Sequence, residues 1–255
     1  MVTVKTTEEI ALLREGGKRL ATILSEVVGA AKAGITGKQL DALAEKRIRE
    51  GGDIPSFLEY KARGKGPAFP ASLCVSMNNQ VVHGLPTDKQ ILKEGDIVSL
   101  DLGLIHKGMF LDSAVTISIG SIDSAAQKLL SVTKEALSIG IAQALAGKHT
   151  GDIGYAIERS IKPHNFGIVR ELAGHGVGYE VHEDPYIPNY GKRGNGTELK
   201  KGMVVAIEPM VNEGSEAIVL DKDGFTYRTA DGKRSAHFEH TIAITDGKPE
   251  VLTQI

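Results

Sequence analysis

The chain has 255 residues, 41% of them hydrophobic, with a net charge of −2 and a pI near 6.5, so its charge indicates no nucleic acid partner. No apolar run approaches the roughly 18 residues of a membrane span, and MVTVKTTEEI lacks the pattern of a secretory signal. The single cysteine, Cys74, cannot form an internal disulfide, which leads us to expect a protein of the reducing cytoplasm.

Two helices are predicted at the start of the chain. Thr6-x-x-Glu9 has the form of a capping box, and apolar residues follow it at helical spacing as far as Ala31. A second helix is predicted from Thr36-x-x-Gln39 to Gly51-Gly52. Residues 53–72 show no period and contain Gly, Pro and Lys, so we expect a loop there.

Strands and two more helices are predicted after this loop. Short β runs, with Asn78-Asn79 as a turn signal, are expected near residues 73–77, 80–83, 97–103 and 109–119. Helical spacing returns in residues 123–146 and again from Thr150 to about residue 161. Later strands are expected near residues 168–172, 203–211, 216–220 and 237–244. The Gly- and Pro-containing stretch 187–200 is predicted to be a loop.

Short segments of the first half recur in the same order in the second. KEGDIVSLD matches KKGMVVAIE at an offset of 107 residues, so Asp101 corresponds to Glu208. LDSAVTIS matches FEHTIAIT, so Asp112 corresponds to Glu239, and VHGLP matches VHEDP, so His83 corresponds to His182. We therefore predict two α-α-β-β halves, residues 1–120 and 121–255, related by an internal pseudo-twofold axis.

Two aspartates lie in the apolar stretch SLDLGLIHKGMFLDS. A turn centred on His106-Lys107 would put Asp101 directly opposite Asp112, with Cβ atoms roughly 4.5–5.5 Å apart. One alternative is that at least one aspartate is exposed at a sheet edge. Because the repeat supplies a second acidic pair inside apolar runs, four buried carboxylates would face one another, which is untenable without cations. This favours a metal site, with His106-Lys107 serving only as the turn.

The segment GHGVGYEVHEDP adds His175 and His182 to this group. A lone histidine is more often structural than a ligand, but two of them beside four paired acids favour a ligand role for at least one. Carboxylates with an imidazole suit a pair of divalent ions such as Mn, Fe, Co or Zn, and not a structural thiolate zinc site. Two such ions roughly 3.5–4 Å apart support metal-assisted hydrolysis.

The motifs SLDLG, GMFLDSAVT, GHGVGYEVHEDP, VVAIEPMVNEG and SAHFEHTIAIT, with VVHGLP upstream, resemble those of the methionine aminopeptidases. These enzymes belong to the larger pita-bread family, which includes prolidase, aminopeptidase P and creatinase. The resemblance implies an α+β pita-bread fold around a mostly antiparallel sheet, in a single catalytic domain over residues 1–255. It also implies removal of the N-terminal methionine from nascent chains, with a preference for a small second residue. The length, and the lack of an insertion between His182 and Glu208, are similar to the short type I enzymes.

The resemblance further implies individual residue roles. The residues that would bind two divalent ions, with Asp112 and Glu239 bridging, are Asp101, Asp112, His175, Glu208 and Glu239. His83 and His182 would contact the substrate and the developing tetrahedral intermediate, and Glu208 would also act as acid and base. Candidates for an apolar slot around the methionine side chain are Cys74, Tyr60, Phe69 and Phe225. For Cys74, a small buried hydrophobe is favoured over a metal ligand.

Three positions depart from the family pattern: Phe225 stands where a Trp is common, His237 where many relatives have Gln, and Asn79 where an acidic residue is usual. Two alternatives to methionine removal stay open. One is another enzyme of this fold, acting before proline or on a small amidine, and the other is a non-enzymatic scaffold for a partner such as the ribosome. The expected partners are nascent N-termini, with no nucleic acid and no membrane. A monomer is expected, and a transient ribosome contact is left open.

Overall fold

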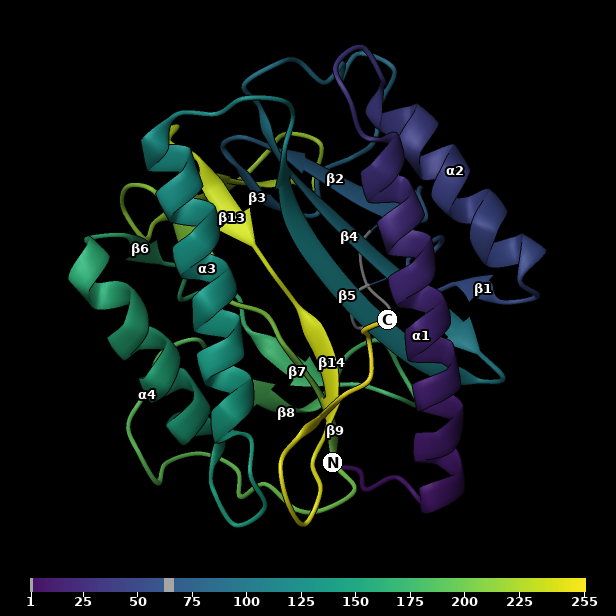
Figure 1. Cartoon of the computed structure of the whole chain (residues 1–255), viewed down its shortest axis with the longest axis vertical. Helices are drawn as coiled ribbons and strands as arrows, with labels where there is room; N and C mark the ends of the chain where they lie inside the picture. Colours follow the sequence, from purple (N-terminus) through teal and green to yellow (C-terminus); the bar gives the residue numbers. More distant parts are fainter. Residues whose placement is uncertain (1, 62–66) are drawn as a thin grey trace.

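The computed structural model describes residues 2–61 and 67–255, and in this part of the chain four α-helices lie on one side of the strands (Figure 1). One pair covers the strands of the first half and the other pair covers those of the second. The helices are α1 (Thr7–Ala30), α2 (Gly37–Glu50), α3 (Ser124–Gln143) and α4 (Thr150–Ile161). This layered α+β arrangement, with two helices before each group of strands, agrees with the predicted fold class.

Both predicted capping boxes are present at the first two helices. The Thr6 hydroxyl accepts the Glu9 N–H at 3.2 Å, and the Glu9 carboxylate accepts the Thr6 N–H at 2.8 Å. Thr36 and Gln39 make the same reciprocal pair at the start of α2. Each box satisfies two N–H groups that the helix itself leaves unpaired. The apolar faces of these helices then pack on the first group of strands.

The first-half sheet has the strand order β1-β4-β2, with β5 paired to β4. All of these pairs are antiparallel, and the strands are β1 (Ile54–Pro55), β2 (Leu73–Met77), β4 (Ile97–His106) and β5 (Met109–Ser118). Three of the predicted β runs are confirmed, although β4 continues three residues beyond its expected end. Cys74 on β2 faces Asp101 on β4 directly, so the two side chains share one face of the sheet.

The second half supplies a five-stranded antiparallel sheet in the order β15-β14-β9-β7-β8. Its strands are β7 (Gly174–Gly176), β8 (Glu183–Ile187), β9 (Val204–Ile207), β14 (His240–Ala243) and β15 (Glu250–Val251). The second hydrophobic core lies between these strands and the α3–α4 pair. The predicted division into halves at residue 120, within a single domain, stays a prediction.

Two smaller sheets complete the described strands, with the orders β13-β10-β6 and β11-β12-β3. Their strands are β3 (Gln80–Val82), β6 (Gly167–Ile168), β10 (Met210–Asn212), β11 (Ile218–Leu220), β12 (Tyr227–Thr229) and β13 (Ser235–His237). The strand expected near residues 168–172 therefore ends early, and β12 was not predicted.

Two long strands expected from the sequence are each broken in the structure. The run 203–211 divides into β9 and β10 around Glu208-Pro209, because proline has no N–H to donate to a ladder. The run 237–244 divides into β13 and β14 around Phe238-Glu239. The two breaks lie side by side, since Met210 pairs with His237 and Ile207 with His240. Both glutamates thus lie where the chain passes from one sheet to another.

The glycine-rich strand β7 was not predicted, because it lacks the branched and aromatic residues typical of strands. Its glycines are required by close backbone approach. A Cβ at Gly174 would lie 2.3 Å from the Ala206 carbonyl oxygen, and one at Gly176 would lie 2.2 Å from that of Asp184. The strand therefore brings His175 deep between β8 and β9.

The prediction that His106-Lys107 serves only as the hairpin turn is wrong. The turn residues are Lys107 and Gly108, whose φ angles of 49° and 85° are those of a type I′ turn. His106 belongs to β4, is buried, and places its Nδ1 atom 2.8 Å from Asp53 Oδ1.

No helix in the described residues is long and apolar enough to cross a membrane.

Candidate metal centre and substrate pocket

The β4–β5 hairpin brings Asp101 and Asp112 together by a different register from the expected one. Asp112 lies opposite Gly103 and Asp101 lies opposite Ala114, so the predicted direct pairing is wrong by two residues. The two-residue turn at Lys107-Gly108 sets this register. A shift of two residues keeps both side chains on the same face, and the two carboxyl groups still interact, as diagonal neighbours.

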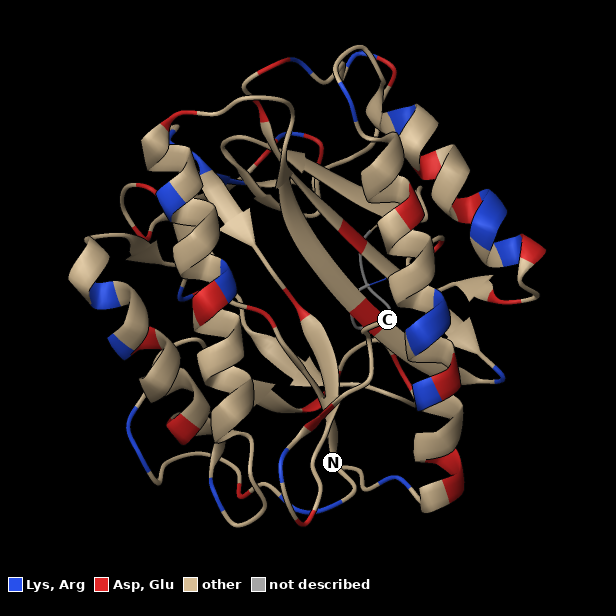
Figure 2. Cartoon of the chain, in the orientation of Figure 1, with Lys and Arg blue, Asp and Glu red and all other residues tan. Residues whose placement is uncertain are grey.

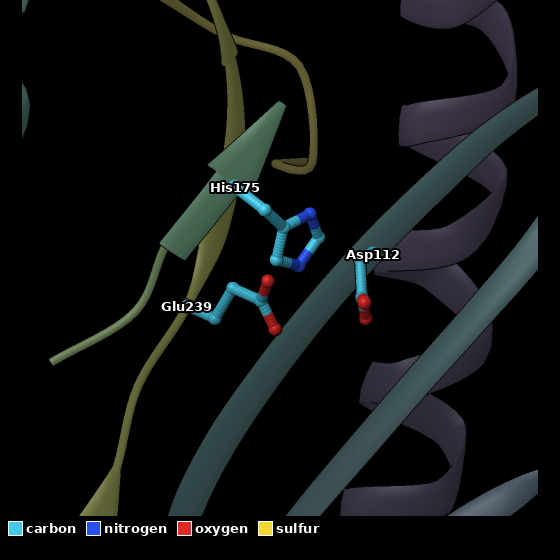
Figure 3. A group of neighbouring side chains, drawn as sticks. All are labelled: Asp112, His175 and Glu239. Carbon is cyan, nitrogen blue, oxygen red and sulfur yellow. The ribbon is translucent and has the colours of Figure 1, made fainter. Parts of the chain in front are cut away.

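Three side chains from separate strands form the centre of the site. Asp112 on β5, His175 on β7 and Glu239 at the β13–β14 break point toward one another (Figure 3). Their ligand atoms all lie within 4.8 Å of one another, and all three side chains are buried. Hydrogen bonds hold β5 against the break, because the Glu239 N–H donates to the Ala114 carbonyl at 2.9 Å and the Ser113 hydroxyl donates to the Glu239 carbonyl at 2.9 Å.

Glu208 and Asp101 extend this centre to five residues. Glu208 Oε1 lies 3.5 Å from His175 Nε2, and Asp101 contacts Asp112. The Nδ1 atom of His175 lies 2.9 Å from the Gly176 carbonyl oxygen, to which it donates as N–H. This hydrogen bond leaves the Nε2 lone pair directed at the carboxylates, as in most histidines that bind metals. The structure therefore places all five predicted ligands around one cavity.

The buried acids of this centre have raised pKa values, although His237 lowers that of Asp101 in part. Burial raises the pKa of Asp101 to about 6, and burial and the neighbouring carboxylates raise the pKa values of Asp112 and Glu239 well above the usual range. Asp101 Oδ1, Asp112 Oδ1 and Glu239 Oε1 have no hydrogen-bond partner among the described residues. No lysine or arginine occurs among the described residues that line the cavity. Oxygen and imidazole donors with this excess of negative charge fit divalent cations.

His237 contacts Glu208 on the side away from His175. Its Nε2 atom lies 3.3 Å from Glu208 Oε2, and the imidazole is buried. Burial lowers its pKa, but the Glu208 carboxylate and the charge of Asp101 together raise it by more, so the net shift is upward. The backbone of His237 is fixed by Thr116 through hydrogen bonds of 2.8 and 2.7 Å. The sequence indicated His237 only as a departure from the family pattern, and its contact with Glu208 was not predicted.

The two histidines matched by the repeat lie at the edge of the same cavity. The rings of His182 and His175 are 4.4 Å apart, and His182 Nδ1 lies 2.6 Å from the Tyr60 hydroxyl. Partial desolvation at the cavity and the neighbouring His175 and His83 lower the pKa of His182, although its side chain remains partly exposed, and burial lowers the pKa of His83. Both imidazoles are therefore neutral at pH 7. Neutral imidazoles retain one N–H donor each.

The remaining cavity wall is mainly apolar. The cavity has a volume of about 330 Å³, and the four predicted slot residues line it: Tyr60, Phe69, Cys74 and Phe225. Phe69 and Phe225 pack edge to face at 5.5 Å. Burial, with a smaller contribution from Asp101, raises the pKa of the Cys74 thiol well above its usual value, so Cys74 is a neutral wall residue. Sequence reasoning missed Phe57, Leu172, Leu220 and Tyr227, which also line the cavity.

Asn79, the third departure from the family pattern, lies outside the cavity lining. Its carbonyl oxygen accepts the Thr229 N–H at 2.9 Å, and its side-chain oxygen accepts a hydrogen bond from Arg228 at 3.2 Å. Asn79 therefore ties the turn after β2 to β12.

Sequence comparison places this arrangement among known proteins. The model of metallopeptidase family M24 matches residues 11–246. A methionine aminopeptidase 1 from Bacillus subtilis is 44% identical over 255 residues, covering 100% of both chains. A methionine aminopeptidase from Clostridium acetobutylicum is 43% identical over 253 residues, covering 99% of both.

Comparison with solved structures agrees with the sequence comparison. The crystal structure of a methionine aminopeptidase from Thermotoga maritima aligns with a TM-score of 0.95 and 41% identity, covering 100% of both chains. A prolidase from Pyrococcus furiosus aligns with a TM-score of 0.79 and 23% identity over 99% of this chain and 65% of the prolidase, which shows a shared fold alone. The expected pita-bread fold is confirmed.

Proposed function

Because the chain belongs to metallopeptidase family M24, we propose that it removes the N-terminal methionine from nascent proteins and peptides, with a preference for a small second residue. The observation that carries the proposal is the convergence of the five candidate ligand side chains and two neutral histidines on one cavity whose remaining wall is mainly apolar. Similarity to methionine aminopeptidases over the full length of the chain supports the same activity.

The proposed cofactor is a pair of divalent ions, drawn from Co, Mn, Fe or Zn. The residues that would hold these ions are Asp101, Asp112, His175, Glu208 and Glu239. When bound, such ions supply a water of lowered pKa and polarise the scissile carbonyl. The unpaired carboxylate oxygens and the free Nε2 lone pair of His175 support this assignment.

The apolar wall would hold the methionine side chain. Phe69, Phe225 and Cys74 offer aromatic and sulfur surface, which suits a flexible thioether. Burial of that side chain orients the first peptide bond toward the acidic centre of the same cavity. Binding energy from the side chain is thereby used to position the reacting group.

Proton transfer is assigned to Glu208. Its carboxylate takes a proton from the attacking water and returns it to the leaving amine. The contact of Glu208 Oε2 with His237 fixes the carboxylate orientation and leaves Oε1 toward His175. His83 and His182, whose lowered pKa values keep both imidazoles neutral, donate N–H groups to the substrate and to the oxyanion that develops at the carbonyl.

The proposal also includes the partners, the oligomeric state and the location of the protein. Nascent polypeptide N-termini are the proposed partners, and a monomer in the cytoplasm is the proposed state. Transient ribosome contact is part of the hypothesis, since nascent N-termini emerge there. No nucleic acid or membrane contact is proposed.

Release of methionine from a Met-Ala-Ser peptide, measured with each divalent metal in turn, tests the proposed function. We expect turnover of Met-Ala-Ser with at least one metal and no comparable cleavage of X-Pro peptides. Faster cleavage of X-Pro peptides would assign the site to the alternative enzyme class. Absence of both activities, together with undetectable metal after anaerobic reconstitution, would favour the scaffold hypothesis.

A further inference from the structure

The segment before α1 contacts the loop that carries His182. This segment, residues 2–5, is called the N-terminal arm below, and the His182 loop is residues 177–182 between β7 and β8. The Lys5 N–H donates to the Gly202 carbonyl at 2.8 Å, which fixes the arm beside the five-stranded sheet. The Lys5 ammonium lies 2.7 Å from Glu183 Oε2. The side chains are only 1% and 6% exposed, so this is a buried ion pair.

Glu183, the residue after His182, joins the arm to residues 179 and 180 of the loop. Its Oε1 atom accepts the backbone N–H groups of Tyr179 and of Glu180, the latter at 3.1 Å. Its Oε2 atom accepts hydrogen bonds from the Thr3 hydroxyl and the Lys5 ammonium. One carboxylate therefore ties residues 179 and 180 to residue 183, and all three to the arm.

The aliphatic part of Lys5 also fits against the loop backbone. A Cβ at Gly178 would lie 2.4 Å from Lys5 Cε, and Gly178 has a φ of +138°, which favours glycine. The Lys5 ammonium lies 4.8 Å from the centre of the Tyr179 ring. From the other side, the Phe110 N–H donates to the Gly178 carbonyl at 2.7 Å. The loop is thus held between the arm and β5.

A buried ion pair is a poor device for stability alone, because desolvation of both charges offsets their attraction and apolar side chains of similar size serve as well. What the pair does supply is a specific position for the loop. It fixes the loop to a segment 178 residues away in the sequence, immediately beside a histidine whose position against His175 and Tyr60 is set within the cavity.

We propose that Lys5 and Glu183 are positioning residues that hold the His182 loop in its catalytic geometry. This inference rests on the proposed function, in which the His182 N–H stabilises the developing oxyanion. Neither Lys5 nor Glu183 lines the cavity, so both act through His182.

The first test is Lys5→Met, which keeps the aliphatic length and removes the charge. We expect kcat for Met-Ala-Ser to fall about 10- to 100-fold, because a misplacement near 1 Å costs that much, while KM changes by no more than about twofold. Mn²⁺ affinity, measured by calorimetry, stays unchanged because Lys5 contacts none of the proposed ligands. Amides of residues 177–183 lose protection against hydrogen exchange. Lys107→Met, at an exposed lysine paired with Glu15, is the matched control and leaves all four quantities unchanged.

The second test repeats Lys5→Met in a His182→Ala background. If Lys5 acts through His182, Lys5→Met lowers kcat no further there, to within about twofold. An equal loss of kcat in both backgrounds would overturn the proposal and leave Lys5 a purely structural role. Should Lys5→Met fail to fold, Lys5→Met/Glu183→Gln removes both charges and is compared in the same two backgrounds. Wild-type protein that releases no methionine under any metal would overturn the proposed function and this inference with it, before any variant is made.

Discussion

Two groups of carboxylates in this molecule differ in how their charge is compensated. At the surface, Arg234 lies 2.7 Å from both Glu213 and Asp123, and these contacts lower the pKa of each acid. At the centre, burial raises the pKa values of Asp101, Asp112 and Glu239. In Figure 2 the β4 and β5 ribbons carry acidic segments and no basic ones.

The difference separates acids whose charge is paired with a cation of the chain from buried acids whose charge a bound cation would compensate. The surface group has its cation within the chain, because Arg234 contacts both acids. The central group carries repulsion that the folded chain relieves only in part, through His237, and a divalent cation would relieve the rest on binding. An acidic cluster with raised pKa values is therefore a stronger indication of a metal site than an acidic cluster alone.

The largest expected effect is loss of turnover when a central acid is removed. Glu239→Ala should lower kcat/KM for Met-Ala-Ser by about a thousandfold or more, because it removes a proposed ligand of the ions, whose charge would supply several kcal/mol of transition-state stabilisation. Glu213→Ala, at the surface group, should leave kcat/KM within about twofold. An active Glu239→Ala enzyme would refute the assignment of the metal site.

Stability against pH should distinguish the two groups next. A carboxyl whose pKa is raised in the folded state contributes stability below its unfolded pKa, and this stability is lost as the pH rises through the folded pKa. For Asp101, metal-free protein should therefore lose on the order of 3 kcal/mol between about pH 4 and pH 7. Added Mn²⁺ should restore it, so the rise in Tm on adding Mn²⁺ grows with pH, as measured by calorimetry. A metal-free Tm independent of pH over this range would contradict the prediction.

A smaller effect is expected at His237, which belongs to neither group but contacts Glu208. His237→Ala should lower kcat about 10- to 100-fold, because groups that orient a metal ligand have effects of this size. His237→Gln retains an N–H donor and should recover most of the loss. Equal kcat values for the Ala and Gln variants would show that the side chain only fills space.

The central group was predictable from the sequence because its signals are local and repeated. Asp101, Asp112, Glu208 and Glu239 each lie in an apolar run, and the internal repeat relates them in pairs. The first two helices were predictable for a similar reason, since their capping boxes are complete within four residues.

What the sequence did not predict depends on tertiary contacts. The hairpin register shifted by two residues because the turn is set by φ angles at Lys107-Gly108, which no alternation pattern reports. The strand β7 was missed because its glycines are required by the close approach of the β8 and β9 backbones, a tertiary contact. The contacts of His237 with Glu208 and of Lys5 with Glu183 join segments 29 and 178 residues apart, and only the fold brings them together.

The smallest expected effect lies in the surface group itself. Glu213→Gln removes one of the two carboxylate charges beside Arg234, which keeps Asp123 as a partner. The Arg234–Glu213 pair is also partly exposed to solvent. The free energy of unfolding should fall by less than about 1 kcal/mol, and the loss should shrink further at high salt, as screening weakens the pair. Urea unfolding at low and high ionic strength measures both. The same salt change should have little effect on the pH-dependent stability of the metal-free centre, because buried charges are screened far less. If salt relieved the central repulsion as readily, those acids would have to be open to solvent, and the contrast between the two groups would fail.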